Sequence, residues 1–437
     1  MTTVSTTPTH QHPHRPGTAR AALSYPAFRI LFIGTALSSV GTWMQNFTLP
    51  AYLDARTGSA GLVGLMVFVQ LGPLLLLSIP AGILADRLDR TRLVVAMQFV
   101  MLVMSVVLAV LVAAGTPLWT IFAAQLAIGI ANTINAPAFS ASIPMLVGRS
   151  DLAGAVSLNS AMINGSRIAG PALAALLAAL GFSVSQLFLV NSATYLFLIV
   201  PLLVSVRLPQ VAARATQQGW RKLTTGLEIV RGRRVLSRTL STMFLFSLVC
   251  LPYIGLFPSV ARLNFGLDPQ RGEYKLLYIV WGLGAFLGAL AVGTWLAHRD
   301  TRRLIPFGLL LFAICLGAFT FLRDWRLALP VAGALGFVYF MTATALASVM
   351  QRNLADHERG SAMPLWFMAF GGTVPVGNLI AGPIMDEVGA RWVLGIGAVF
   401  ALALATWANL AQLDEDDFLP VDDGGEPFVP VNANRLF

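Results

Sequence analysis

One arginine lies where an apolar sequence can least easily hold a charge. Arg167 falls near the middle of an apolar run that covers about 155–180. As a helix, this run would place Arg167 about 18 Å from its start, and a charge at that depth in a membrane costs several kcal/mol unless it faces protein or water. We expect Arg167 either to line a cavity, where it would favour an anionic or polyphenolic ligand over a cation, or to bond backbone carbonyls between helices.

Other polar and aromatic side chains inside the apolar runs could line the same cavity or form hydrogen bonds between helices. They are Trp43, Asn46, Gln70, Gln125, Asn132, Asn135, Asn164, Tyr253 and Asn378. The acidic residues of the runs, in contrast, lie near predicted helix ends: Asp54, Asp86, Glu273, Asp386 and Glu387. Proton coupling needs a group whose protonation responds to conformation or cargo, and no carboxylate occurs at the depth of Arg167.

The sequence contains no constellation of residues that indicates an enzyme or a metal site. Cys250 and Cys315 fall in different runs, and His298 and His357 are separate loop residues. No Gly-x-x-x-x-Gly-Lys phosphate loop is present either. We therefore expect no catalytic residue, no bound metal and no cofactor.

The elements that carry these residues are membrane-spanning helices. Of the 437 residues, 56% are hydrophobic and 11% are charged, and the mean hydropathy is +0.74. A span needs about 20 apolar residues, and twelve runs of about that length occur: about 28–52, 60–84, 93–114, 117–140, 155–180, 184–206, 236–262, 273–297, 303–322, 326–349, 361–385 and 390–412. The sequence predicts an all-α integral membrane protein with twelve transmembrane helices.

Polar segments divide the chain into five parts. We expect a disordered N-terminal tail at 1–27, a six-helix bundle at 28–206, a central loop at 207–235, a second six-helix bundle at 236–412 and an acidic tail at 413–437. Most Lys and Arg residues fall in the tails and the even-numbered loops, which places both termini in the cytoplasm. The net charge of +9 therefore reflects topology, and we expect no nucleic-acid partner.

A short basic motif follows the second run. It contains Gly82, Asp86, Arg87, Arg90 and Arg92. Gly82 would let the second helix approach a neighbour closely. Asp86 could face the positive end of a helix or pair with an arginine in one conformation only. This pattern predicts a gate.

Two short sequence motifs each occur twice, separated by nearly the same number of residues, which indicates an internal repeat. The motif after the second run returns as residues 293–303 after the eighth, and Gly170-Pro171 in the fifth run returns as Gly382-Pro383 in the eleventh. Each proline removes a backbone hydrogen bond and should bend its helix. Transporters built from repeats place their substrate between the repeats, near the middle of the membrane.

The basic motif resembles that of the major facilitator superfamily, with Asp89 where the family has its second glycine. The stretch from Leu158 to Pro171 resembles the exporter branch that includes enterobactin and multidrug exporters. Drug antiporters of the superfamily often carry an arginine four residues before a glycine in the fourth helix, where this sequence has Gln125 before Gly129. The resemblance covers about residues 28–412 and implies two pseudo-symmetric six-helix bundles that alternate access by rocking.

These observations and the resemblance together predict a secondary active transporter of a bacterial cytoplasmic membrane. We expect a monomer that exports a small amphipathic molecule, such as a siderophore or a lipophilic drug, in exchange for protons. An importer or facilitator of a nutrient or metabolite on the same fold is the first alternative. A lipid transporter is the second.

Overall fold

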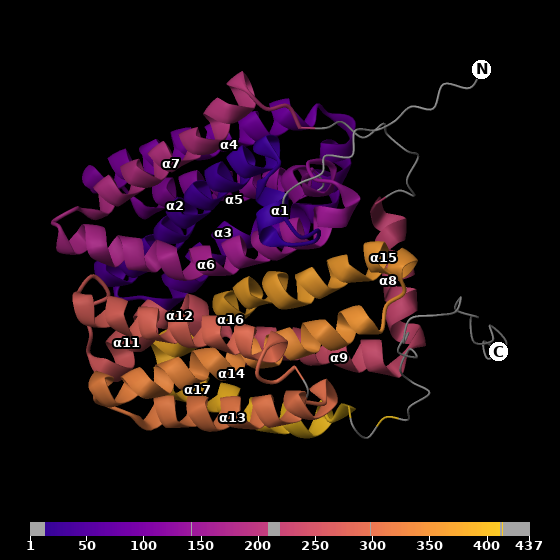
Figure 1. Ribbon diagram of the computed structural model, residues 1–437. Coiled ribbons are helices and arrows are strands. Elements are labelled where there is room, and N and C mark those ends of the chain that lie inside the picture. The colour runs from indigo at the N-terminus through magenta and orange to yellow at the C-terminus, as the bar shows by residue number, and fades with distance from the viewer. Residues whose placement is uncertain (1–13, 141, 209–218, 298, 411–412, 414–437) are drawn as a thin grey trace, which may run out of the picture.

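The chain folds into two bundles of long helices that lie side by side (Figure 1). The computed structural model describes residues 14–140, 142–208, 219–297, 299–410 and 413, and all regular structure in these residues is helical. The first bundle contains α2 (Pro26–Thr57), α3 (Ala60–Arg87), α4 (Arg90–Ala113), α5 (Leu118–Ser140), α6 (Leu152–Ala179) and α7 (Val184–Val204). The second contains α9 (Arg234–Leu245), α10 (Pro252–Gly255), α11 (Phe257–Phe265), α12 (Gly272–Gly293), α13 (Thr301–Phe321), α14 (Trp325–Arg352), α15 (Asp356–Phe367), α16 (Thr373–Val388) and α17 (Ala390–Trp407).

Eleven helices in the described part of the chain are long and apolar enough to cross a membrane, so the predicted count of twelve is not confirmed. The seventh run is the exception, because it is divided into α9, a π-helical turn at Phe246–Cys250, α10 and α11. Pro252 and Pro258 each lack the backbone N–H that an uninterrupted helix would use. A second π-helical turn, Met368–Gly372, joins α15 to α16. Turns of this kind inside helices are frequent at functional sites.

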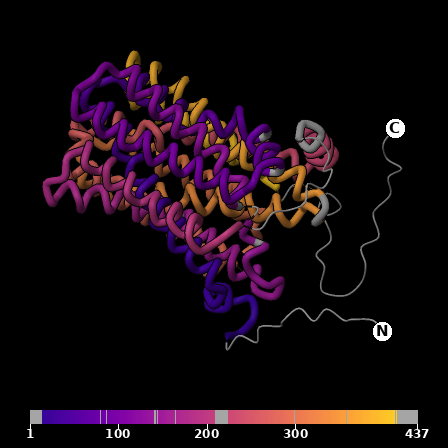
Figure 2. The backbone as a smooth tube through the Cα atoms, turned by 90° about the horizontal axis from the view of Figure 1, so that it is seen from above, coloured from indigo at the N-terminus to yellow at the C-terminus, as the bar shows by residue number. Residues whose placement is uncertain are grey.

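The two ends of the molecule differ in what covers them. At one end, α8 (Gly219–Gly232) connects the bundles and packs on α15; we call this the α8 end (Figure 1). At the opposite end, α2 ends, α3 begins and α16 ends; we call this the Asp54 end. The view from above likewise shows α8 at one end of the molecule (Figure 2).

Two segments that the sequence placed in a tail and a loop are partly helical. Residues 1–27 contain α1 (Ala19–Leu23), which packs on α6. Asp151 fixes it there, because its carboxylate accepts hydrogen bonds from the Gly17 amide at 2.9 Å and the Tyr25 hydroxyl at 3.0 Å. The loop 207–235 contains α8, and Arg233 after it pairs with Glu358 of α15. Residues 1–13 and 414–437 of the predicted tails lie outside the described residues.

Glycines allow the closest helix contact in the second bundle. Gly284 and Gly288 of α12 lie against the backbone of α14, where a Cβ atom would collide with the carbonyl oxygens of Gly333 and Phe337. Small residues of this kind let helices approach in a membrane, where van der Waals packing drives association.

We expect Gly288→Ala to destabilise the protein by about 1–3 kcal/mol, because the added methyl group must push two helix backbones apart. Gly395→Ala in α17 is the matched control, since no atom lies within 4 Å of its Cβ position. Thermal unfolding in detergent measures both. A midpoint for Gly288→Ala equal to that of the control would contradict the close contact.

Candidate functional site

Two adjoining hollows lie between the bundles and form one central cavity. The larger has a volume of about 160 Å³ and the smaller about 80 Å³. Five residues border both: Trp43 of α2, Arg167 of α6, Ile254 of α10, Tyr278 of α12 and Tyr339 of α14. Both bundles therefore supply walls of the same cavity.

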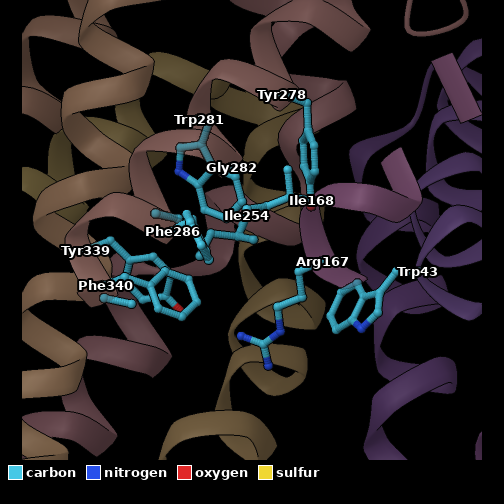
Figure 3. Close-up of a pocket in the computed structure, with 12 residues that line it drawn as sticks. Trp43, Arg167, Ile168, Ile254, Tyr278, Trp281, Gly282, Phe286, Tyr339 and Phe340 are labelled. Carbon is cyan, nitrogen blue, oxygen red and sulfur yellow. The ribbon is translucent and has the colours of Figure 1, made fainter. Parts of the chain in front are cut away.

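Arg167 is the charged residue of this cavity. Its guanidinium carbon lies 5.1 Å from the centre of the Trp43 ring and 5.7 Å from that of Phe340. Figure 3 shows the side chain between Trp43 on one side and Tyr339 and Phe340 on the other. The Nε atom is buried and has no hydrogen-bond partner among the described residues. The described residues that line the two hollows include no Asp or Glu.

The wall opposite Arg167 is aromatic and belongs to the second bundle. The Tyr278 and Trp281 rings lie 5.3 Å apart, and the Trp281 ring stacks on Tyr339 at 6.2 Å. Sequence reasoning missed this wall. The signal was present, because Tyr274, Tyr278 and Trp281 are spaced four and three residues apart and so share one face of a helix.

Of the other predicted cavity residues, three line the larger hollow: Trp43, Asn46 and Gln70. Phe370 and Gly371 of the second π-helical turn lie on the same border. The side chain of Asn164 lies outside the described part of the structure. Asn132 is exposed, and Asn135, whose Oδ1 atom is buried, does not border either hollow.

Gln125, Tyr253 and Asn378 are buried within the helix packing and do not border these hollows. Gln125 accepts a hydrogen bond from Gln45 at 3.3 Å, in a polar network of the first bundle. Tyr253 accepts one from the Trp281 indole at 3.1 Å. Asn378 donates to the Val374 carbonyl of its own helix at 2.8 Å.

The Asp54 end is closed by two carboxylates that bond across the bundles. Asp54 of α2 is fully buried and accepts hydrogen bonds from Ser259 at 2.6 Å and from Arg262 at 2.8 Å, both on α11. Asp386 of α16 reaches the start of α3, where it accepts bonds from the Ser59 hydroxyl and from the amides of residues 60 and 61 at 2.7–2.8 Å. A carboxylate at a helix N-terminus is favourable because the free amides there carry partial positive charge. Each bundle thus supplies one carboxylate to the other.

Two glycines permit this closure. A Cβ at Gly64 of α3 would collide with the Asn378 carbonyl of α16, and one at Gly382 would lie 2.5 Å from the Ala60 carbonyl oxygen. The repeat-related Gly170 lies instead against α2 of its own bundle, where an added Cβ would lie 2.6 Å from the Met44 amide nitrogen. Pro171 and Pro383 follow these glycines, and the helices continue through both.

At the α8 end, the predicted gate motif lies at the junction of α3 and α4. A Cβ at Gly82 would meet nothing within 4 Å, so the expected close approach to another helix is not seen. Asp89 replaces the family glycine and caps α4, where its side chain accepts a bond from the Arg92 amide at 2.8 Å. Arg87 and Arg92 are exposed, and Arg90 is buried near Met145. The Asp86 side chain lies outside the described part of the structure.

Two helical bundles around a shared central cavity are the architecture of the major facilitator superfamily, and solved structures of that superfamily have the same fold. The nucleoside transporter NupG matches with a TM-score of 0.65 at 14% identity, covering 89% of this chain and 100% of that one. A bacterial homologue of the human lysosomal transporter Spinster, inward-facing and occupied, matches with a TM-score of 0.68 at 14% identity, covering 91% and 99%.

The family model for transmembrane secretion effectors matches residues 17–435, and the chain belongs to this family. Macrolide efflux protein A of Streptococcus pyogenes is 22% identical, covering 85% of this chain and 93% of the relative. The staphyloferrin A transporter of Staphylococcus aureus is 24% identical, covering 83% and 90%. The enterobactin exporter EntS of Salmonella typhimurium is 25% identical, covering 92% and 97%. The chain is thus a transporter of the superfamily, and its relatives include exporters.

We expect Asp54→Ala to open the Asp54 end more than Asp386→Ala does. Asp54 is fully buried in its pair with Arg262, whose side chain is 28% exposed, so this pair contributes more than a carboxylate at an exposed helix end, which contributes about 0.3–1 kcal/mol. The reporter is a cysteine at Asn46 in the cavity, in a chain whose Cys250 and Cys315 are alanine. Labelling by an impermeant maleimide that reaches the protein from the side of the Asp54 end should accelerate at least tenfold with Asp54→Ala and about twofold to fivefold with Asp386→Ala.

Asp324→Ala is the matched control for this labelling experiment. Asp324 caps α14 through the Arg326 amide at 2.8 Å, and its described contact does not cross the bundles. Equal rates of maleimide labelling in Asp54→Ala and Asp324→Ala would contradict the closure of the Asp54 end by the Asp54 carboxylate.

Proposed function

We propose that this protein exports a small amphipathic molecule from the bacterial cytoplasm by alternating access. The observation that carries this proposal is the central cavity, which takes walls from both bundles and is covered at the Asp54 end by bonds between them. The names of the relatives support export of a lipophilic drug or a siderophore. One chain supplies both walls, so we propose that the monomer is the working unit.

The distribution of charge supports an orientation. Because Lys and Arg gather in the tails and the even-numbered loops, the α8 end faces the cytoplasm and the Asp54 end faces outward in this proposal. The protein would then be inward-facing, with the outer end closed and the cavity ready to load from the cytoplasm. Export requires the outer bonds to break while the α8 end closes around the motif from Gly82 to Arg92.

We propose that the export is coupled to protons, which enter from the more acidic outer side of a respiring bacterial membrane as the cargo leaves.

A reversible lock tests this mechanism. Ser59→Cys with Asp386→Cys places two thiols where the native side chains touch at 2.7 Å, in a chain whose Cys250 and Cys315 are alanine. Cells loaded with a macrolide, a lipophilic dye or a catecholate siderophore should lose the cargo slowly under oxidising conditions. Reduction should restore export to the level of the single-cysteine controls, and an uncoupler should abolish it.

Export at the same rate in the oxidised and reduced states, with the disulfide verified by mass spectrometry, would contradict alternating access at this end. Accumulation of the cargo in the cells, in place of its loss, would indicate that the protein imports it.

A further inference from the structure

The central cavity contains a fixed positive charge that no described residue of its lining balances. Arg167 is the charged residue on the border of both hollows, and the described lining has no carboxylate. A guanidinium stays protonated in proteins, so the site cannot become neutral by losing a proton. A ligand that covers the partly buried Arg167 shields its charge from water, which is costly unless the ligand supplies an anionic group that pairs with it.

The surroundings of Arg167 define where an anion can bind. Trp43 and Phe340 lie close to two sides of the guanidinium, at 5.1 and 5.7 Å. The rings restrain the group through cation–π attraction, but they accept no hydrogen bond in the plane of the guanidinium, where its donors point. Figure 3 shows the guanidinium between these two side chains. Its Nε is buried and has no partner in the part of the chain that the structure describes.

The remaining surface of the cavity suits a flat apolar body. Beside Arg167 lie Tyr278, Trp281, Phe286 and Tyr339, and the smaller hollow that they border has a volume of about 80 Å³. Aromatic side chains stack on planar rings with offset or edge contacts. Arg167 belongs to the first bundle and the aromatic wall to the second, so the two bundles border the same small space.

We propose that the substrate is an amphipathic anion with an aromatic body, and that its anionic group pairs with Arg167. A carboxylate or a sulfonate can accept two parallel bonds from a guanidinium, and the single oxygen of a phenolate can accept a charge-assisted bond. A cation would meet a like charge in the same place, and a neutral analogue would bury Arg167 without a partner. The proposal rests on the proposed function and specifies the cargo of the same cavity.

Three planar naphthalenes of almost the same shape test this charge preference. They are 2-naphthoate, 2-naphthamide and 2-naphthamidine, which carry a negative, a zero and a positive charge at pH 7. Isothermal titration calorimetry with the full-length protein in detergent measures their affinities. We expect the naphthoate to bind at least tenfold more tightly than either of the other two probes.

Variants of Arg167 assign the preference to this side chain. Arg167→Gln should bring the three affinities within about threefold of one another, while Arg167→Lys should keep part of the preference. Arg326→Gln is the matched control, because Arg326 also lies over an indole, that of Trp325 at 5.8 Å, but does not border the cavity. It should retain the full preference. Binding of 2-naphthamide to Arg167→Gln at least as tightly as to the wild type verifies that the variant is folded.

The inference is overturned if the amide or the amidine binds the wild type as tightly as the naphthoate does. It is also overturned if none of the three binds, or if Arg167→Gln retains the preference for the naphthoate. These outcomes are distinguishable from failure of the proposed function. The disulfide lock across Ser59 and Asp386 measures export whatever the charge of the cargo. If a neutral or cationic cargo is exported in the reduced state and retained in the oxidised state, the proposed export stands and only the anionic substrate is rejected.

Discussion

The contact between α3 and α16 is the constraint on which the closed end depends. Gly64 and Gly382 let the two helices approach through their backbones, and Asp386 then reaches the free amides at the start of α3. The buried pair of Asp54 and Arg262 adds a second bond between the bundles at the same end. Since Asp386 is exposed and Asp54 is fully buried, Asp54 contributes the larger share of the closure.

The two bundles supply different kinds of residue to the central cavity. The first bundle places Arg167 and Trp43 in the cavity, and the second supplies Tyr278, Trp281 and Tyr339. A ligand in the cavity contacts residues of both bundles. A rocking motion of one bundle relative to the other would therefore change which residues surround the ligand. This is how a cavity between two bundles can bind cargo at one side of a membrane and release it at the other.

Patterns of neighbouring residues in the sequence predicted the features of the structure that are determined locally. Apolar runs predicted where the spans lie, and the depth of Arg167 predicted a place on a cavity, because neither depends on distant residues. The sequence did not predict the division of the seventh run, since a π-helical turn depends on packing around it. It noted Asp54 and Asp386 only as acidic residues near helix ends. Their partners, residues 262 and 59–61, are far away in sequence, and only the tertiary structure brings them together.

Distances at both ends of the same molecule test the central claim most directly. One spin-label pair would be at Ala114 and Glu387, at the Asp54 end. The other would be at Arg149 and Gln351, at the α8 end. All four positions are exposed, and each pair joins the first bundle to the second. Pulsed electron paramagnetic resonance in nanodiscs measures both pairs in the native background and with Asp54→Ala. We predict that the substitution lengthens the first distance and shortens the second. A longer first distance with an unchanged second would mean local fraying at the Asp54 end, and would contradict a rocking motion of the two bundles.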